Sequence, residues 1–183
     1  LVTINVLKTN KVNDRTHMSI SPLAMEQASA RYDDESKIAF IKYKGVLSAE
    51  ESTAVYDWLA DLVEVIGLDE MYGEVFDFRE VTEFAPDNLM QARRNSRRHN
   101  MRNNVRHLPV AMIVSNFYQE EILRGPMQNV EENKRKAIVW KMDEAVAFLR
   151  EWHAEQDKEE AAKKTTEIEV DEMDTMRIEV ESD

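Results

Sequence analysis

The sequence predicts an α/β fold with a mixed sheet of about five strands, on three observations. Strand-like and helix-like segments follow one another in the order β-β-α-β-α-β-α-β-α. The first two strand-like segments are separated by a short polar turn. A later run, residues 108–115, is almost continuously apolar, which is typical of a strand buried on both faces of a parallel sheet. We therefore expect an N-terminal antiparallel hairpin followed by parallel strands with right-handed crossovers.

The hairpin is predicted over residues 27–32 and 37–44. The second segment is rich in β-branched and aromatic residues, which favour strands. Residues 33–36 between them, Asp-Asp-Glu-Ser, have the chemistry of a turn.

The clearest helix is predicted from Ser48 to Ile66. Ser48 and Glu51 have the spacing of a capping box. Gly67 has the residue type expected at a helix C-terminus. Apolar residues recur on one helical face, at positions 55, 59, 62, 63 and 66.

The remaining elements follow in order, and each has a local signal. We predict a short strand at 74–78, a helix from about 87 to 105 capped by Asp87, and the buried strand at 108–115. A short helix at 117–124 is stopped by Gly125-Pro126, and the last strand covers 136–140. A final helix begins at Asp143 and continues as a polar extension.

Composition limits the function classes. The chain has 183 residues, 43% of them hydrophobic, and a formal net charge of −12. It contains no Cys, which excludes disulfides, thiolate metal sites and a cysteine nucleophile. A reducing compartment fits this composition, so we predict a cytoplasmic location. No apolar run approaches the ~20 residues that a membrane-spanning helix needs.

Three regions are predicted. Residues 1–18 form an N-terminal extension that we expect to precede the native start, with Met18 or Met25 initiating. Residues 19–154 form the α/β domain, and residues 155–183 form a polar helix extension and an acidic tail. From residue 165 onward, eight acidic residues stand against Arg177, a net charge of −7. We expect this tail to be disordered, with a conditional strand or hairpin as the alternative.

The most unusual segment spans residues 88–109. It carries six arginines and no acid, a net charge of +6. Several of them recur at i, i+3 and i+4 spacing, where like charges repel. Three interpretations stay open: a solvated face neutralised by nearby acids, a surface that binds an anionic partner, or a contact with the chain's own acidic tail. The segment has no aromatic residue to stack bases, so nucleic acid is an unlikely partner. The predicted partner-binding residues are Arg93, Arg94, Arg97, Arg98, Arg102 and Arg106.

A second candidate site follows from topology. Ligands of open α/β sheets bind beyond the carboxyl ends of parallel strands. Arg79, Thr82, Ser115 and Asn116 lie there and could hold a small anion. In the alternative interpretation, Arg79 pairs with a neighbouring acid, and Ser115 or Asn116 caps the next helix.

No catalytic pattern is present. The sequence has no GxSxG elbow, P-loop, GxGxxG or EF-hand loop. Its four histidines lack metal-ligand spacing. We therefore predict a protein that is not an enzyme and has neither cofactor nor metal.

A few segments carry a resemblance to a known family. They are Gly45 before the helix that starts at Ser48, the strand end Asp77-Phe78-Arg79, the run 109–114, and Trp140-Lys141-Met142-Asp143-Glu144-Ala145. Their order resembles the STAS domains (sulfate transporter and anti-sigma factor antagonist) and the related CRAL-TRIO lipid-transfer type. The resemblance implies an α/β fold and a role in regulation or ligand carriage. Antagonist STAS domains have a phosphorylatable hydroxyl at the start of the helix after strand three, whereas residues 84–89 here have none.

The predicted function is a non-enzymatic regulatory or interaction module. It would bind an acidic protein, or another anionic partner, through the basic helix. The alternative is a carrier or sensor of a small apolar or anionic ligand.

Overall fold

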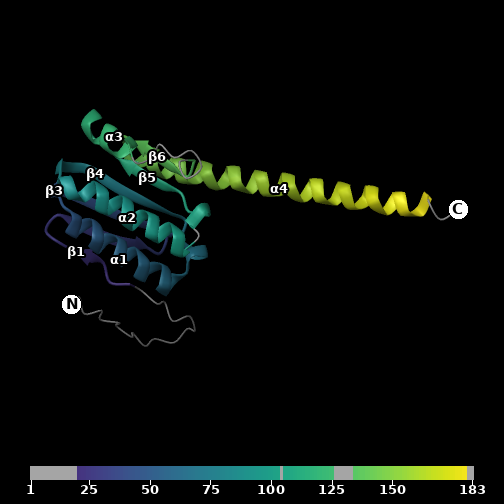
Figure 1. The fold of residues 1–183 in the computed structure, drawn as a ribbon, viewed down its shortest axis with the longest axis horizontal. Helices are drawn as coiled ribbons and strands as arrows, with labels where there is room; N and C mark the ends of the chain where they lie inside the picture. Colours follow the sequence, from purple (N-terminus) through teal and green to yellow (C-terminus); the bar gives the residue numbers. More distant parts are fainter. Residues whose placement is uncertain (1–19, 104, 126–133, 181–183) are drawn as a thin grey trace. The chain divides into compact units, whose positions relative to one another are not determined.

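The computed structural model describes residues 20–103, 105–125 and 134–180. By its contacts the chain divides after Leu149 into two units. The first contains a six-stranded sheet with the strand order β1-β2-β3-β4-β5-β6 (Figure 1). The strands are β1 Leu23–Ala24, β2 Ala28–Asp33, β3 Ile38–Leu47, β4 Gly73–Phe84, β5 Val110–Ile113 and β6 Lys136–Val139. The helices are α1 Ala49–Ile66, α2 Pro86–Asn103, α3 Phe117–Arg124 and α4 Met142–Val180, with short 3₁₀ turns at Leu68–Glu70 and Val105–His107.

Strand pairing confirms the predicted fold class. β1, β2 and β3 pair antiparallel, and β3, β4, β5 and β6 pair parallel. The described residues contain one strand more than the five expected. This extra strand, β1, has only two residues, and it pairs Leu23 with Ala30. So short a segment leaves no alternation to detect in the sequence.

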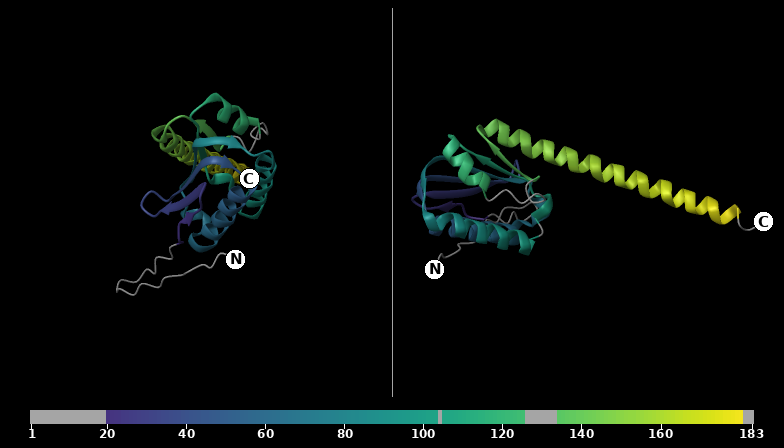
Figure 2. Two further views of the ribbon diagram at one scale, coloured as in Figure 1. Left: turned by 90° about the vertical axis from the view of Figure 1, so that its left-hand side faces the viewer. Right: turned by 45° about the horizontal axis from the view of Figure 1, so that its top comes forward.

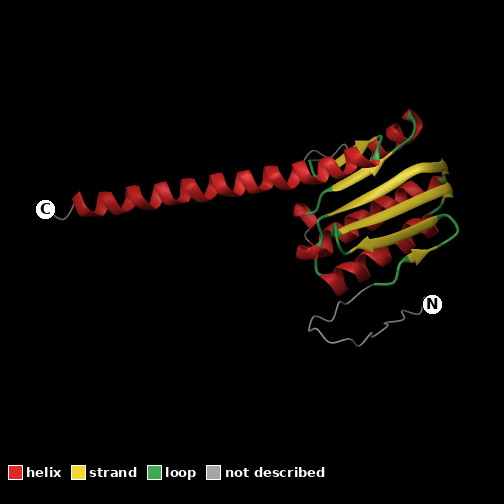
Figure 3. Ribbon diagram, turned by 180° about the vertical axis from the view of Figure 1, so that it is seen from behind, coloured by secondary structure: helices red, strands yellow, loops and turns green. Residues whose placement is uncertain are grey.

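The two faces of the sheet bury different helices. Alternate residues of β4 point to opposite faces, so Phe76 and Phe78 pack in one core cluster and Val75 packs in another. The first cluster receives α1, together with Leu89 of α2 and Ile122 and Leu123 of α3. The second receives Ala145 and Leu149 from the start of α4. Figure 2 shows α1 and α2 side by side along the first face, and Figure 3 shows the sheet from the other side.

The N-terminus of α1 is capped as the sequence predicts. The Ser48 hydroxyl accepts a hydrogen bond from the Glu50 amide at 3.2 Å, and the Glu51 carboxylate accepts one from the Ser48 amide at 3.0 Å. The capping box is confirmed. Gly67 ends the helix with φ of 90°, a conformation that residues with a Cβ rarely adopt.

The cap predicted for α2 is wrong. The helix begins at Pro86, which places Asp87 inside the first turn. Proline suits the first helical position because it has no amide hydrogen to leave unpaired and its φ is already helical. Asp87 still favours this end of the helix, because its charge complements the helix dipole.

Strand β4 is much longer than the predicted strand at 74–78. Residues 79–84, beyond the predicted strand, continue it and pair with β3 as far as Phe84. The pairing of β4 with β5 ends at Asp77 and Ile113, so among the described strands only β3 pairs with the second half of β4. Its pattern is therefore half polar, with Val81 and Phe84 buried between exposed residues.

The acidic tail was expected to be disordered or a strand, and this was wrong for the described residues, where α4 runs to Val180. Residues 159–164, Glu-Glu-Ala-Ala-Lys-Lys, favour a helix through high propensity and Glu–Lys pairs four apart.

The predicted extension 1–18 lies outside the described residues. The boundaries 19–154 and 155–183 stay a prediction.

Candidate functional site

The basic residues of α2 form two exposed stripes. Arg94, Arg98 and Arg102 follow one another at intervals of four, and Arg93 and Arg97 do the same. All five side chains are exposed. Arg106 lies in the 3₁₀ turn after α2, and its side chain is outside the described part of the structure. The predicted partner-binding residues are thus brought together on one helix, with Arg106 next to its end.

None of these five arginines takes part in an ion pair with a described residue. Some acids of the described residues pair with other cations, for example Glu70 with Lys37 at 2.6 Å and Glu80 with Lys42 at 2.6 Å. Within the described ranges, the repulsion between the arginines is therefore not offset by a neutralising acid. The interpretation as a neutralised, solvated face finds no support there.

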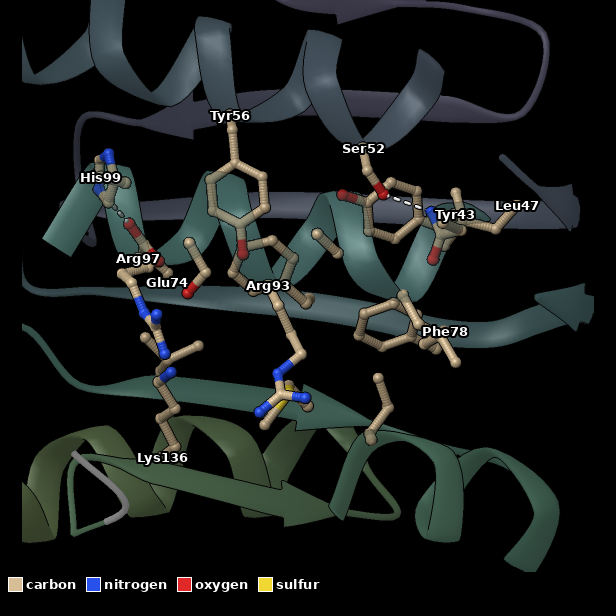
Figure 4. Close-up of a pocket in the computed structure, with 18 of the residues that line it drawn as sticks. Tyr43, Leu47, Ser52, Tyr56, Glu74, Phe78, Arg93, Arg97, His99 and Lys136 are labelled. Carbon is tan, nitrogen blue, oxygen red and sulfur yellow. Dashed lines mark hydrogen bonds and ion pairs between the residues drawn. The ribbon is translucent and has the colours of Figure 1, made fainter. Parts of the chain in front are cut away.

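A pocket lies between α1, α2 and the face of the sheet that these two helices cover (Figure 4). Its apolar wall consists largely of aromatic rings from β3 and β4. The ring centroids of Tyr43 and Phe78 are 5.2 Å apart, those of Phe76 and Phe78 6.3 Å, and those of Phe78 and Phe84 6.0 Å. The cavity volume is about 160 Å³. Apolar cavities of roughly 150 Å³ hold one benzene ring, so this pocket has room for about one ring.

Arg93 and Arg97 belong to the lining of this pocket. In Figure 4 both guanidinium groups point away from the α2 ribbon, on the side of Lys136. Arg135 and Lys136 also line the pocket, and among the residues that the structure describes Glu74 is the one carboxylate in the lining. The pocket therefore combines an aromatic wall with an excess of positive charge.

Several polar atoms of the lining are buried without a hydrogen-bond partner among the described residues: Glu74 Oε1, His99 Nε2 and Asn100 Nδ2. Glu74 and His99 are nevertheless adjacent, with Oε1 and Nε2 3.5 Å apart. The Asn100 side-chain oxygen accepts a hydrogen bond from Arg135 at 2.9 Å, so its amide nitrogen is left as a donor. A buried donor without a partner costs about 1–3 kcal/mol, which a bound acceptor would recover.

Tyr56 supplies a neutral hydroxyl to the same pocket. Burial is the main cause that raises the pKa of Tyr56 to about 12, against a smaller opposing effect of a side-chain hydrogen bond with Ser96. The phenol therefore stays protonated at neutral pH.

The predicted strand-end site has its polar groups engaged within the fold. The Arg79 guanidinium donates to both Asp77 carboxylate oxygens, at 2.9 and 2.7 Å. Burial opposes ionisation of Asp77, but the hydrogen bonds and charge of Arg79 outweigh it and lower the pKa of the Asp77 carboxyl. The Ser115 hydroxyl donates to the Arg79 carbonyl at 3.0 Å, and the Asn116 side chain caps α3 by accepting from the Gln119 amide at 2.9 Å.

Arg79 and Ser115 are therefore brought together, while the side chain of Thr82 is exposed on β4. These contacts match the alternative interpretation of an internal ion pair and a helix cap. A ligand-binding role for Arg79, Thr82, Ser115 and Asn116 stays a prediction.

The sequence reasoning missed the pocket. The spacing of Phe76 and Phe78, two apart, shows that they share a face of the strand. Nothing in the sequence shows that Tyr43 stacks beside them or that Arg93 lies opposite. The sequence places these arginines on one helix but gives no signal that separates Arg93 and Arg97 from the stripe of Arg94 and Arg98.

In the described part of the chain, no group of three or more His, Asp or Glu side chains could hold a metal ion. Among the described helices, none is long and apolar enough to cross a membrane.

Comparison with known proteins gives matches of structure only. No family model and no curated protein matches the chain. The fold is similar to that of an uncharacterized DUF3478-family protein with a SpoIIAA-like fold from Shewanella loihica PV-4. The two share 14% identity over 69% of this chain and 97% of that chain, with a TM-score of 0.49. It is also similar to an anti-sigma factor antagonist from Mycobacterium paratuberculosis, with 12% identity over 69% of this chain and 97% of that one and a TM-score of 0.44.

These two matches concern the fold alone. Neither matched protein is described as a CRAL-TRIO lipid-transfer protein. The α/β fold class of this chain is established by its own strand order and pairing.

Proposed function

We propose that this chain is a non-enzymatic interaction module that docks an acidic segment of a protein partner onto α2. One observation carries the proposal: five exposed arginines of α2 have no ion-pair partner among the described residues. Like charges at i, i+3 and i+4 spacing destabilise a helix by a few tenths of a kcal/mol per pair. An acidic segment bound along the helix relieves this repulsion.

The composition of the surface supports a protein partner. Met90 and Met101 lie on the same helix as the arginines and are 74% and 80% exposed. Met90, Arg94, Arg98 and Arg102 recur every four residues, so they form one continuous stripe. Methionine and arginine are both enriched at protein–protein interfaces. The helix therefore offers apolar contact area beside its charge.

A nucleic acid fits this surface less well. The helix from Pro86 to Asn103 contains no aromatic side chain on which a base could stack. The chain as a whole carries a net charge of −12, which opposes the approach of a long polyanion. A short acidic peptide segment meets only the local positive charge of α2. The chain's own tail, residues 165–183, is an acidic segment of this kind and remains a second possible occupant of the same surface.

The test compares two charge reversals of equal size. Arg94→Glu with Arg98→Glu changes the stripe, and Arg150→Glu with Lys158→Glu makes the same change in net charge on exposed positions of α4. The probe is a fluorescent poly-glutamate peptide, and anisotropy is measured with the full chain at several salt concentrations. We expect the first variant to bind at least about tenfold more weakly, and the second to bind like the native chain.

Binding to the native chain should weaken as salt rises, because the contacts are exposed ion pairs. Equal loss of binding in both variants would mean that only net charge matters, and would overturn the assignment to α2. Circular dichroism of each variant establishes that the fold is kept.

A further inference from the structure

We propose that the pocket between α2 and the sheet binds a small organic monoanion, an aromatic or short-chain carboxylate, whose charged group is held by Arg93 and Arg97. The site takes two of the five α2 arginines, Arg93 and Arg97, which line the pocket, and leaves the stripe of Arg94, Arg98 and Arg102 outside it.

The wall determines the apolar part of the ligand. Tyr43, Phe76, Phe78 and Phe84 form a chain of stacked and tilted rings, and Met112 lies in the lining beside them. Aromatic rings pack favourably against such a surface in offset or edge-to-face arrangements. A flat ring or a short alkyl chain therefore fits the wall.

The volume of the cavity limits the size of the ligand. A cavity of about 160 Å³ accepts roughly one benzene-sized group. Pockets for drug-sized ligands are at least about 300 Å³. A small acid therefore matches this volume better than the long acyl chains of a phospholipid do.

The positive charge of the pocket lining favours a ligand with a negative charge. Arg93, Arg97, Arg135 and Lys136 line the pocket, and Glu74, the one carboxylate of the lining in the described ranges, lies against His99 at 3.5 Å. Arg93 and Arg97 form no ion pair with any described residue. A guanidinium group binds a carboxylate through two parallel hydrogen bonds, which gives these residues a specific role that a lone point charge lacks.

Polar atoms inside the pocket point to the same ligand class. Asn100 Nδ2 is a buried donor without a partner in the described structure, and its oxygen is fixed by Arg135. A carboxylate offers two acceptor oxygens and several lone pairs, so it can take a hydrogen bond from this amide as well as from the arginines.

The experiment uses benzoate as the probe, with benzamide as a neutral molecule of nearly the same shape. The full chain is labelled with ¹³C at its methionine methyl groups and titrated while the methyl spectrum is recorded. Met112 lines the pocket, whereas Met90 and Met101 are exposed on α2 and outside it. We expect benzoate to shift the Met112 signal with a Kd of about 1 mM or tighter, and to leave Met90 and Met101 unchanged. Benzamide should bind at least about tenfold more weakly, because it lacks the charge.

Two matched variants locate the charge. Arg93→Gln with Arg97→Gln should weaken benzoate binding at least about tenfold. Arg94→Gln with Arg98→Gln removes the same charge from the same helix and should leave the benzoate Kd within about twofold. Ala92→Leu narrows the pocket without changing its charge and should also weaken binding.

Three results would overturn the proposal. They are equal affinities for benzoate and benzamide, equal effects of the two arginine pairs, and the absence of any Met112 shift at benzoate concentrations well above 1 mM. The readout differs from the poly-glutamate assay, so either site can fail while the other stands.

Discussion

Asn88 connects the first turn of α2 to the first turn of α1. Its side-chain amide donates to the Ser48 carbonyl at 2.7 Å and to the Ser52 hydroxyl at 2.6 Å, and both Asn88 and Ser52 are buried. Asn88→Leu keeps the number and branching of the side-chain heavy atoms but removes both hydrogen bonds. Each such bond contributes about 0.5–1.5 kcal/mol. We therefore expect the free energy of unfolding to fall by about 1–3 kcal/mol.

The assay is urea unfolding followed by far-UV circular dichroism, with a thermal melt beside it. A loss of this size lowers Tm by about 2–4 °C per kcal/mol in a domain of this length. Asn95→Leu is the matched control, because Asn95 is also buried on α2 but its two hydrogen bonds are longer: it donates to Thr53 and accepts from Gln91, each at 3.2 Å. Asn95→Leu should lower the free energy of unfolding by less than Asn88→Leu does.

Ser52→Ala completes a double-mutant cycle with Asn88→Leu. The two changes share one hydrogen bond, so their effects should fall short of additivity by about 0.5–1.5 kcal/mol. If Asn88→Leu stays within about 0.5 kcal/mol of the native chain, or the two effects simply add, then these bonds do not hold α2 in place.

Three further predictions concern separate parts of the chain. The pKa of the Asp77 carboxyl is lowered, so its ionised form stabilises the fold above about pH 4, and this contribution is lost as pH falls through the folded-state pKa. Asp77→Asn should therefore lose less stability than the native chain between pH 7 and about pH 3, measured by urea unfolding; an unchanged pH profile would contradict this. Leu149→Ala removes a fully buried side chain between α4 and the sheet, and should lower the free energy of unfolding by about 2–5 kcal/mol in the same assay. A loss of less than about 1 kcal/mol would mean that this face of the sheet packs loosely. Ending the chain at Lys164 removes a net charge of −7 and should raise the affinity for poly-glutamate at low salt; equal affinities would exclude the tail as a competitor for α2.

The parts of the fold that the sequence predicts are those with local causes. The capping box of Ser48 and Glu51 needs only a spacing of three residues, and it is present in the structure. The run at 108–115 is apolar because β5 lies between two parallel neighbours, so its burial was also predictable. The full length of β4 depends instead on pairing with β3, which is far away in the sequence, and its exposed half looks like a loop.

Helix α2 shows why the site was only half predictable. Its buried residues are polar: Asn88, Asn95 and His99. An apolar stripe, which normally marks the inward face of a helix, is therefore missing. The arginines could be assigned to the helix from sequence, but those beside the pocket could not be told apart from those on the outer stripe.

The two proposed sites on α2 are close enough to influence each other. Arg93 and Arg97 lie one position before Arg94 and Arg98, about 100° around the helix, so the two pairs stay close in space while facing different surroundings. A carboxylate bound in the pocket brings a negative charge next to the docking stripe and occupies two of the five unpaired arginines of α2. We therefore expect benzoate to weaken the binding of poly-glutamate. Since coupling between two ligands is reciprocal, poly-glutamate must weaken benzoate binding by the same factor. Measuring both factors distinguishes direct coupling through α2 from a general effect of ionic strength, which would lower each affinity without making the two factors equal.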